Sequence, residues 1–168
     1  GVSGARKVGV PLEFADGRWN LDPARVEAAI TEKTRMIFVN TPANPTGWTA
    51  SLADLSALME IARRHGIWIL ADEIYALYHF AGGRAPSFLD IMEEGDRIVF
   101  INSFSKNWSM TGWRVGWLVA PPEIGDTIEN LVQYTTSGVA QFMQQGALAA
   151  IRDGDPVIAE NYERARIG

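Results

Sequence analysis

The residues with the clearest chemical potential lie between positions 103 and 114. Lys106 ends the stretch Ser103-Phe104-Ser105-Lys106, and Arg114 follows eight positions later. A lysine amine forms a Schiff base with an aldehyde, while small hydroxyls and a guanidinium bind a phosphate. The set therefore suits a cofactor with both groups on one ring, as in pyridoxal phosphate. Taken alone, the stretch is explained more simply as a solvated surface lysine in a turn.

The lysine stretch is one of three polar clusters in the sequence, and each cluster follows an apolar run. Asn44 comes shortly after one run, and Asp72 with Tyr75 comes directly after the next. The runs are β-branched and of strand length, at residues 36–40, 67–70 and 97–102. Ligands bind outside the carboxyl ends of the strands in a parallel sheet, so we expect all three clusters to face one crevice.

The elements that must position these clusters alternate between strand and helix. We predict a first strand over residues 6–12, a turn at Asp16-Gly17, and a helix begun by Asp22 as N-cap and Pro23. A second helix is expected from about Ser51 to Gly66, a short helix or turn over 74–78, and a short helix over 88–94. A buried strand over 115–120 and helices over 124–135, 139–151 and 157–166 complete the pattern. It predicts an α/β fold, a three-layer α/β/α sandwich with a mostly parallel sheet.

Composition excludes several classes of protein. The chain has 168 residues, enough for one domain, and a formal charge of −5, which argues against a nucleic-acid partner. No run of 18 apolar residues or signal-peptide pattern is present, so we expect no membrane partner. The absence of cysteine excludes disulfides and thiolate metal sites, and we predict no metal site and a cytoplasmic protein.

The three clusters together resemble the class I and II aminotransferases, which are pyridoxal-phosphate enzymes of fold type I. The resemblance rests on three blocks in the same order: Asn44-Pro45-Thr46-Gly47, Asp72-Glu73-Ile74-Tyr75, and Ser103-Phe104-Ser105-Lys106 with Arg114-Val115-Gly116. The third block is highly specific, because it fixes the spacing of lysine, arginine and glycine together. The form of this block is closer to aspartate, aromatic or kynurenine-type aminotransferases than to carbon–sulfur lyases.

The resemblance implies a role for each matching residue. Lys106 would carry the cofactor as an aldimine and then move the substrate proton, and Asp72 would face the pyridine nitrogen. Tyr75 and Asn44 would bond the ring hydroxylate. The cofactor phosphate would be held by the two hydroxyls and the guanidinium, from Ser103, Ser105 and Arg114. The implied reaction moves an amino group between an α-amino acid and a 2-oxo acid. The resemblance also implies that the full-length protein is a homodimer.

The resemblance also implies that residues 1–168 are part of a longer chain. Fold type I enzymes are more than twice this length, and we find neither their upstream phosphate loop nor their small C-terminal domain. We therefore expect a partial large domain, in which roughly 154–168 begin the helix leading to the small domain, and a fragment that is inactive alone. Three alternatives stay open: a β-lyase of the same fold, an amino-acid synthase, and a non-catalytic sensor domain of a transcription regulator.

Overall fold

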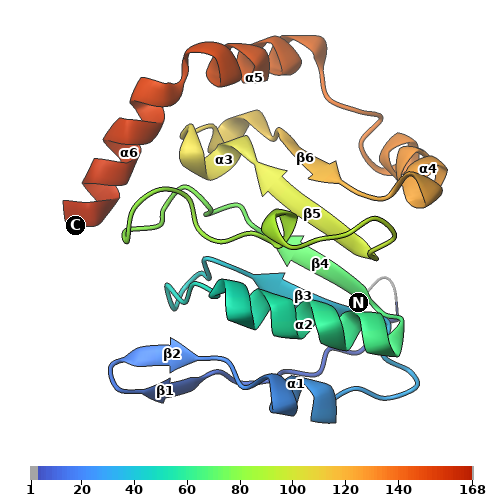
Figure 1. The fold of residues 1–168 in the computed structure, drawn as a ribbon. Helices are drawn as coiled ribbons and strands as arrows, with labels where there is room; N and C mark the ends of the chain where they lie inside the picture. The colour runs from blue at the N-terminus through green and yellow to red at the C-terminus, as the bar shows by residue number, and fades with distance from the viewer. Residues whose placement is uncertain (1–3, 168) are drawn as a thin grey trace.

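The computed structural model describes residues 4–167, and its centre is a four-stranded sheet (Figure 1). The strand order is β3-β4-β5-β6; the first three strands are parallel and β6 runs antiparallel to β5. Their bounds are β3 (Met36–Asn40), β4 (Trp68–Asp72), β5 (Ile98–Ser103) and β6 (Gly116–Val119). The sheet is thus mixed and mostly parallel, as the sequence predicted.

The connection from β3 to β4 contains α2 (Leu52–His65), whose two ends are set by local signals. Ser51 and Asp54 form a capping box at its start, and Gly66 ends it in the left-handed conformation, with φ 62°. The helix buries Leu55 and Leu58 against the sheet, where Ile69 is also fully covered. The predicted helix is therefore confirmed at both ends.

The N-terminal part differs from the prediction. Residues 6–12 form no strand; instead β1 (Glu13–Ala15) and β2 (Arg18–Asn20) make a separate hairpin around the predicted turn at Asp16-Gly17. The predicted helix follows as α1 (Pro23–Ala28), with the Asp22 side chain accepting from the Ala24 amide. The prediction placed the strand too early because an apolar run does not show which other strand it could pair with.

Short helices surround the lysine stretch. The expected helix over 88–94 is reduced to the 3₁₀ turn η1 (Phe88–Asp90), and residues 74–78 form turns. Lys106 lies not in a simple turn but in the one-turn helix α3 (Phe104–Asn107), which is followed by η2 (Thr111–Trp113). β6, expected to be buried, is exposed throughout.

The C-terminal third is helical, and part of it packs against the lysine segment. It comprises η3 (Pro122–Ile124), α4 (Gly125–Thr135), α5 (Gln141–Asp153) and α6 (Asp155–Ile167). Ala147 of α5 packs in a small second core with Phe104, Met110 and Val115. This packing holds the segment that carries Lys106 against α5.

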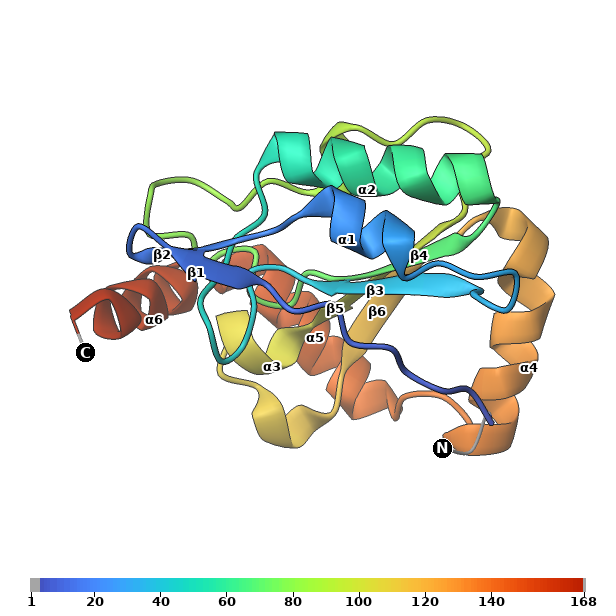
Figure 2. The ribbon, with the colours of Figure 1, turned by 90° about the horizontal axis from the view of Figure 1, so that it is seen from below.

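Helices lie on both sides of the sheet, as expected for an α/β sandwich. α1 and α2 lie on one side, and α5 lies on the other (Figure 2). The side away from α2 is open at β3, where Met36 and Phe38 are exposed. None of the helices described within residues 4–167 combines the length and apolar character needed to cross a membrane.

Candidate active site

Three of the predicted site residues line one cavity at the carboxyl ends of the parallel strands. Tyr75, Ser105 and Lys106 border a space of about 480 Å³. The Lys106 Nζ atom lies 5.9 Å from the centroid of the Tyr75 ring, at the outer limit of a cation–π contact. Within residues 4–167, Lys106 forms no ion pair. The amine is therefore held beside a phenol without a neutralising carboxylate.

Asn44 and Tyr75 come from different loops and are joined by a hydrogen bond. Asn44 Nδ2 donates to the Tyr75 hydroxyl at 3.3 Å, while the Asn44 amide donates to the Asn40 side chain at 3.0 Å. The second bond fixes the loop after β3 to the last residue of that strand. The fold thus brings together an amide and a phenol that come from two separate sequence blocks.

Ser103 and Ser105 are placed by the start of α3. The Ser103 hydroxyl accepts from the Ser105 amide at 3.0 Å, so it caps the short helix. The Thr111 hydroxyl donates to the Ser105 carbonyl at 3.1 Å and ties η2 to the same turn. Three small hydroxyls therefore lie around the start of α3, and hydroxyls of this kind can donate to an anion.

Arg114 stands directly after η2 in the left-handed conformation, with φ 53°. Its only hydrogen bond to another of residues 4–167 runs from Nη1 to the Thr111 carbonyl at 2.9 Å. The guanidinium therefore keeps donors for a ligand. Arg114 does not line the cavity around Lys106. The residues predicted to bind phosphate therefore lie further apart than the sequence suggested.

Asp72 ends β4 and is half-buried. Its Oδ1 accepts from the Ile74 amide at 3.4 Å, and its carbonyl accepts from the Asn40 side chain at 3.2 Å. Asp72 pairs with Ile101 of β5, and because side chains alternate along a strand, Ser103 shares its face of the sheet. That face is the one away from α2. The carboxylate lies at the predicted edge but does not border the cavity around Lys106.

Sequence reasoning missed Tyr78, which touches the lysine segment directly. Its hydroxyl donates to the Lys106 carbonyl at 3.0 Å, and its ring lies 6.4 Å from that of Tyr75. Burial raises the pKa of the Tyr78 phenol, with a smaller contribution from Tyr75. The signal was available, because a second tyrosine three residues after the first falls on the same side of a helical turn.

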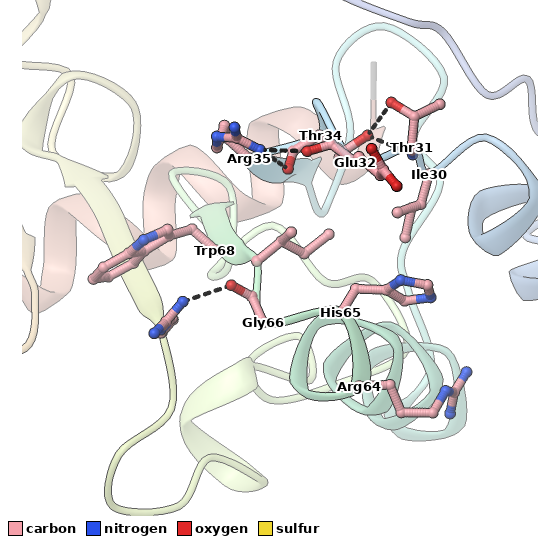
Figure 3. A pocket seen from close by; sticks show the side chains of 11 residues that line it. Ile30, Thr31, Glu32, Thr34, Arg35, Arg64, His65, Gly66 and Trp68 are labelled. Carbon is pink, nitrogen blue, oxygen red and sulfur yellow. Dashed lines mark hydrogen bonds between the residues drawn. The ribbon is translucent and has the colours of Figure 1, made fainter.

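A larger depression lies at the opposite edge of the sheet, where the strands begin (Figure 3). It measures about 800 Å³ and is bordered by Arg35, Trp68 and Arg97 among others. Arg97 donates to the Gly66 carbonyl at 2.6 Å and Arg35 to the Glu32 carbonyl at 2.7 Å. These guanidinium groups already bind backbone carbonyls, and His65, which also borders the depression, is paired with Glu27 at 3.2 Å, so we assign this depression no chemistry.

The donor groups at the carboxyl edge fit pyridoxal phosphate. They comprise an amine beside a phenol–amide pair, a carboxylate at the next strand end, and hydroxyls with a guanidinium for an anion. Among residues 4–167 the amine has no carboxylate in an ion pair, and the guanidinium retains donors. Each functional group of the cofactor therefore has a chemical counterpart among the described residues.

Comparison with known proteins identifies the family to which the chain is similar. The family model "Aminotransferase class I and II" matches residues 2–167. The arginine–pyruvate transaminase of Pseudomonas aeruginosa is 36% identical over 170 residues, which cover 99% of this chain and 42% of the relative. The aspartate aminotransferase of Bacillus subtilis is 37% identical over 149 residues, covering 88% of this chain and 38% of the relative.

A solved structure agrees with the sequence relatives. N-Succinyldiaminopimelate aminotransferase from Mycobacterium tuberculosis superposes with a TM-score of 0.87 at 32% identity, covering 98% of this chain and 44% of that one. The chain thus spans about two fifths of the length of these relatives. Since the match extends over nearly every residue and includes all three polar blocks, this chain belongs to the class I and II aminotransferase family.

Proposed function

We propose that the full-length protein is a pyridoxal-phosphate-dependent aminotransferase acting on an α-amino acid and a 2-oxo acid. The observation that carries this is the Lys106 amine, which lies beside Tyr75 at the carboxyl ends of parallel strands and has no carboxylate partner in the described chain. Family membership supports the same reaction.

The residues that would hold the cofactor are those gathered at this edge. Lys106 would bind its aldehyde carbon, Tyr75 and Asn44 its ring hydroxyl, and Asp72 its pyridine nitrogen. Its phosphate would be bound by Ser103, Ser105 and Arg114. When bound, pyridoxal phosphate would supply an electron sink for the negative charge left on the substrate α-carbon.

Lys106 has the chemistry required of the base. Its amine would take the proton from the substrate α-carbon and return it at the cofactor side. Asp72 would keep a proton at the pyridine nitrogen, because a carboxylate beside that atom favours the charged ring. Arg114 would fix the phosphate through charge-assisted hydrogen bonds and so hold the reacting atoms within reach of Lys106.

We further propose that residues 1–168 are part of the large domain of a longer protein. The support is the coverage of the relatives, about two fifths of their length. Residues 154–168 would then begin the helix leading to a small domain, and α6 does run over Asp155–Ile167. We also propose that the full-length protein is a cytoplasmic homodimer with no nucleic-acid or membrane partner. The family resemblance supports the homodimer, and the acidic charge argues against nucleic acid.

The first test is the colour of the full-length protein with pyridoxal phosphate. We expect a visible absorption band that borohydride removes by attaching the cofactor to Lys106, as peptide mapping would show. Lys106→Ala should abolish the band. The matched control is Lys33→Ala, at an exposed lysine in the loop before β3 that should leave the band unchanged. A reducible adduct that survives in Lys106→Ala would place the Schiff base elsewhere.

The second test separates an aminotransferase from other enzymes of the fold. An aminotransferase converts an amino acid and 2-oxoglutarate to a new 2-oxo acid and glutamate, with no net release of ammonia. A β-lyase instead releases pyruvate and ammonia from one substrate. Assaying both on the same preparation decides between them, and a protein that binds cofactor without either turnover would favour the sensor.

A further inference from the structure

Glu73 is a buried carboxylate directly after β4, and its contacts lie away from the cavity around Lys106. The residue is 3% exposed. Its Oε2 accepts from the Ser87 hydroxyl at 2.6 Å and its Oε1 accepts from the Phe88 amide at 3.1 Å. Burial raises the pKa of Glu73, and these two hydrogen bonds partly offset the effect. Both oxygens are therefore committed to the start of η1.

These bonds close the base of a loop over residues 74–86. The loop starts just after Glu73 and comes back to the Glu73 side chain at Ser87, so one side chain joins its two ends. A second tie lies just inside, where the Ala85 amide donates to the Ala76 carbonyl at 2.8 Å. Ala85 and Phe88 are fully buried, whereas residues 80–84 are exposed. The loop is thus fixed at its base by buried contacts, while at its exposed tip Arg84 pairs with Asp90 and Phe80 packs on Tyr162.

Both phenols of the candidate site belong to this loop. Tyr75 accepts from Asn44, and Tyr78 donates to the Lys106 carbonyl at 3.0 Å. Each of these contacts is a single hydrogen bond, and the Asn44 bond is long at 3.3 Å. The loop's ion pair between Arg84 and Asp90 is partly exposed and therefore weak, so the buried tie at the base supplies much of the order that opposes the entropy of the loop.

We propose that Glu73 is a positioning residue, whose carboxylate fastens the 74–86 loop so that Tyr75 and Tyr78 stay against Asn44 and Lys106. The inference rests on the proposed function, because it assigns Glu73 to the same site. Glu73 does not touch the reacting groups itself: it does not border the cavity, and its two oxygens bind Ser87 and Phe88.

The test uses the full-length protein loaded with pyridoxal phosphate. Glu73→Met keeps the length of the side chain and removes both acceptors. Glu73→Gln is the conservative variant, because its oxygen can accept from Phe88 while its amide group donates to Ser87. Ser87→Ala removes the hydrogen bond from the Ser87 hydroxyl to Glu73. It replaces Glu73→Met in the test if that variant does not fold. Glu93→Gln is the control at an exposed carboxylate beyond η1.

The first readout is amide hydrogen exchange over residues 74–86. We expect exchange at least about tenfold faster in Glu73→Met, the size of one lost charge-assisted hydrogen bond. Glu73→Gln should stay near the wild type, Ser87→Ala should lie between, and Glu93→Gln should be unchanged. Unaltered exchange in both Glu73→Met and Ser87→Ala overturns the proposal.

The second readout is the pH midpoint of the cofactor absorption band, which general destabilisation does not move. We expect Glu73→Met to shift it by about half a unit or more, in the same direction as Tyr75→Phe. In the Tyr75→Phe background, Glu73→Met should add almost nothing, because both changes remove the same contact. Fully additive shifts overturn the proposal. If the wild type shows no band at all, the proposed function has failed, and hydrogen exchange alone decides whether Glu73 holds the loop.

Discussion

Replacing Gly116 by alanine should disturb the strand pair that carries the lysine segment. Gly116 begins β6 and pairs with Ser103, the last residue of β5. A Cβ at this position would lie 2.6 Å from the Asn102 carbonyl oxygen and 3.4 Å from the Ser103 Cα atom. Both contacts are with backbone, so no side-chain rotation relieves them. The two strands must separate by roughly 0.8 Å, the difference between 2.6 Å and the 3.4 Å of ordinary contact.

The cost of this separation follows from where the strands lie. Overpacking of this kind costs about 1–3 kcal/mol. β6 is exposed and at the edge of the sheet, so it can yield, but only by lengthening its hydrogen bonds to β5. We therefore expect a loss of about 2 kcal/mol in the free energy of unfolding. We also expect weaker binding of pyridoxal phosphate, by about tenfold, because Ser103 and Arg114 are displaced together.

The measurement is urea unfolding of the full-length apoprotein, with an absorbance titration of the cofactor. Gly112→Ala is the matched control in the same segment, since no atom lies within 4 Å of a Cβ there and its φ is not in the left-handed region. It should change stability by less than about 0.5 kcal/mol. If Gly116→Ala behaves like Gly112→Ala in both measurements, the backbone contact does not constrain the site and the reasoning is wrong.

Three other predictions concern charge and completeness. Arg63 donates from Nε and Nη2 to the two oxygens of Asp96, at 2.7 Å each, and this lowers the pKa of Asp96 below its ordinary value of 3.8. The resulting stabilisation is present above that value and is lost as the pH falls through the lower folded-state pKa. Asp96→Asn should therefore cost about 1–2 kcal/mol near neutral pH, allowing for the partly exposed Arg63, and the difference should shrink below about pH 4 in urea unfolding. A difference that does not change with pH would contradict the ion-pair account. Asp72→Asn should slow the loss of the cofactor band by roughly a hundredfold, measured in a single turnover after amino acid is added. This estimate uses about 1.4 kcal/mol for each factor of ten in rate. A rate within about fivefold of wild type would mean that Asp72 is an ordinary strand-end carboxylate. The purified 168-residue chain should not transaminate at a useful rate, and substantial turnover would show that the rest of the relatives' length is dispensable.

The sequence alone determined the features that depend on neighbouring residues. The capping box at Ser51 and the left-handed Gly66 are local signals, and they define both ends of α2. The turn at Asp16-Gly17 and the cap at Asp22 are equally local. The order of polar blocks after apolar runs was enough to predict that Tyr75 and Lys106 would meet, because parallel strands bring their carboxyl ends to one edge.

Tertiary structure decided the features that depend on distant partners. Residues 6–12 are apolar enough for a strand but pair with none, whereas the hairpin that forms lies just beyond them. The role of Glu73 was hidden for a similar reason. It follows Asp72 directly, and adjacent residues at a strand end point to opposite faces. One carboxylate therefore stays at the candidate site while the other is buried against Ser87, fourteen residues away, and only the fold brings that partner within hydrogen-bonding distance.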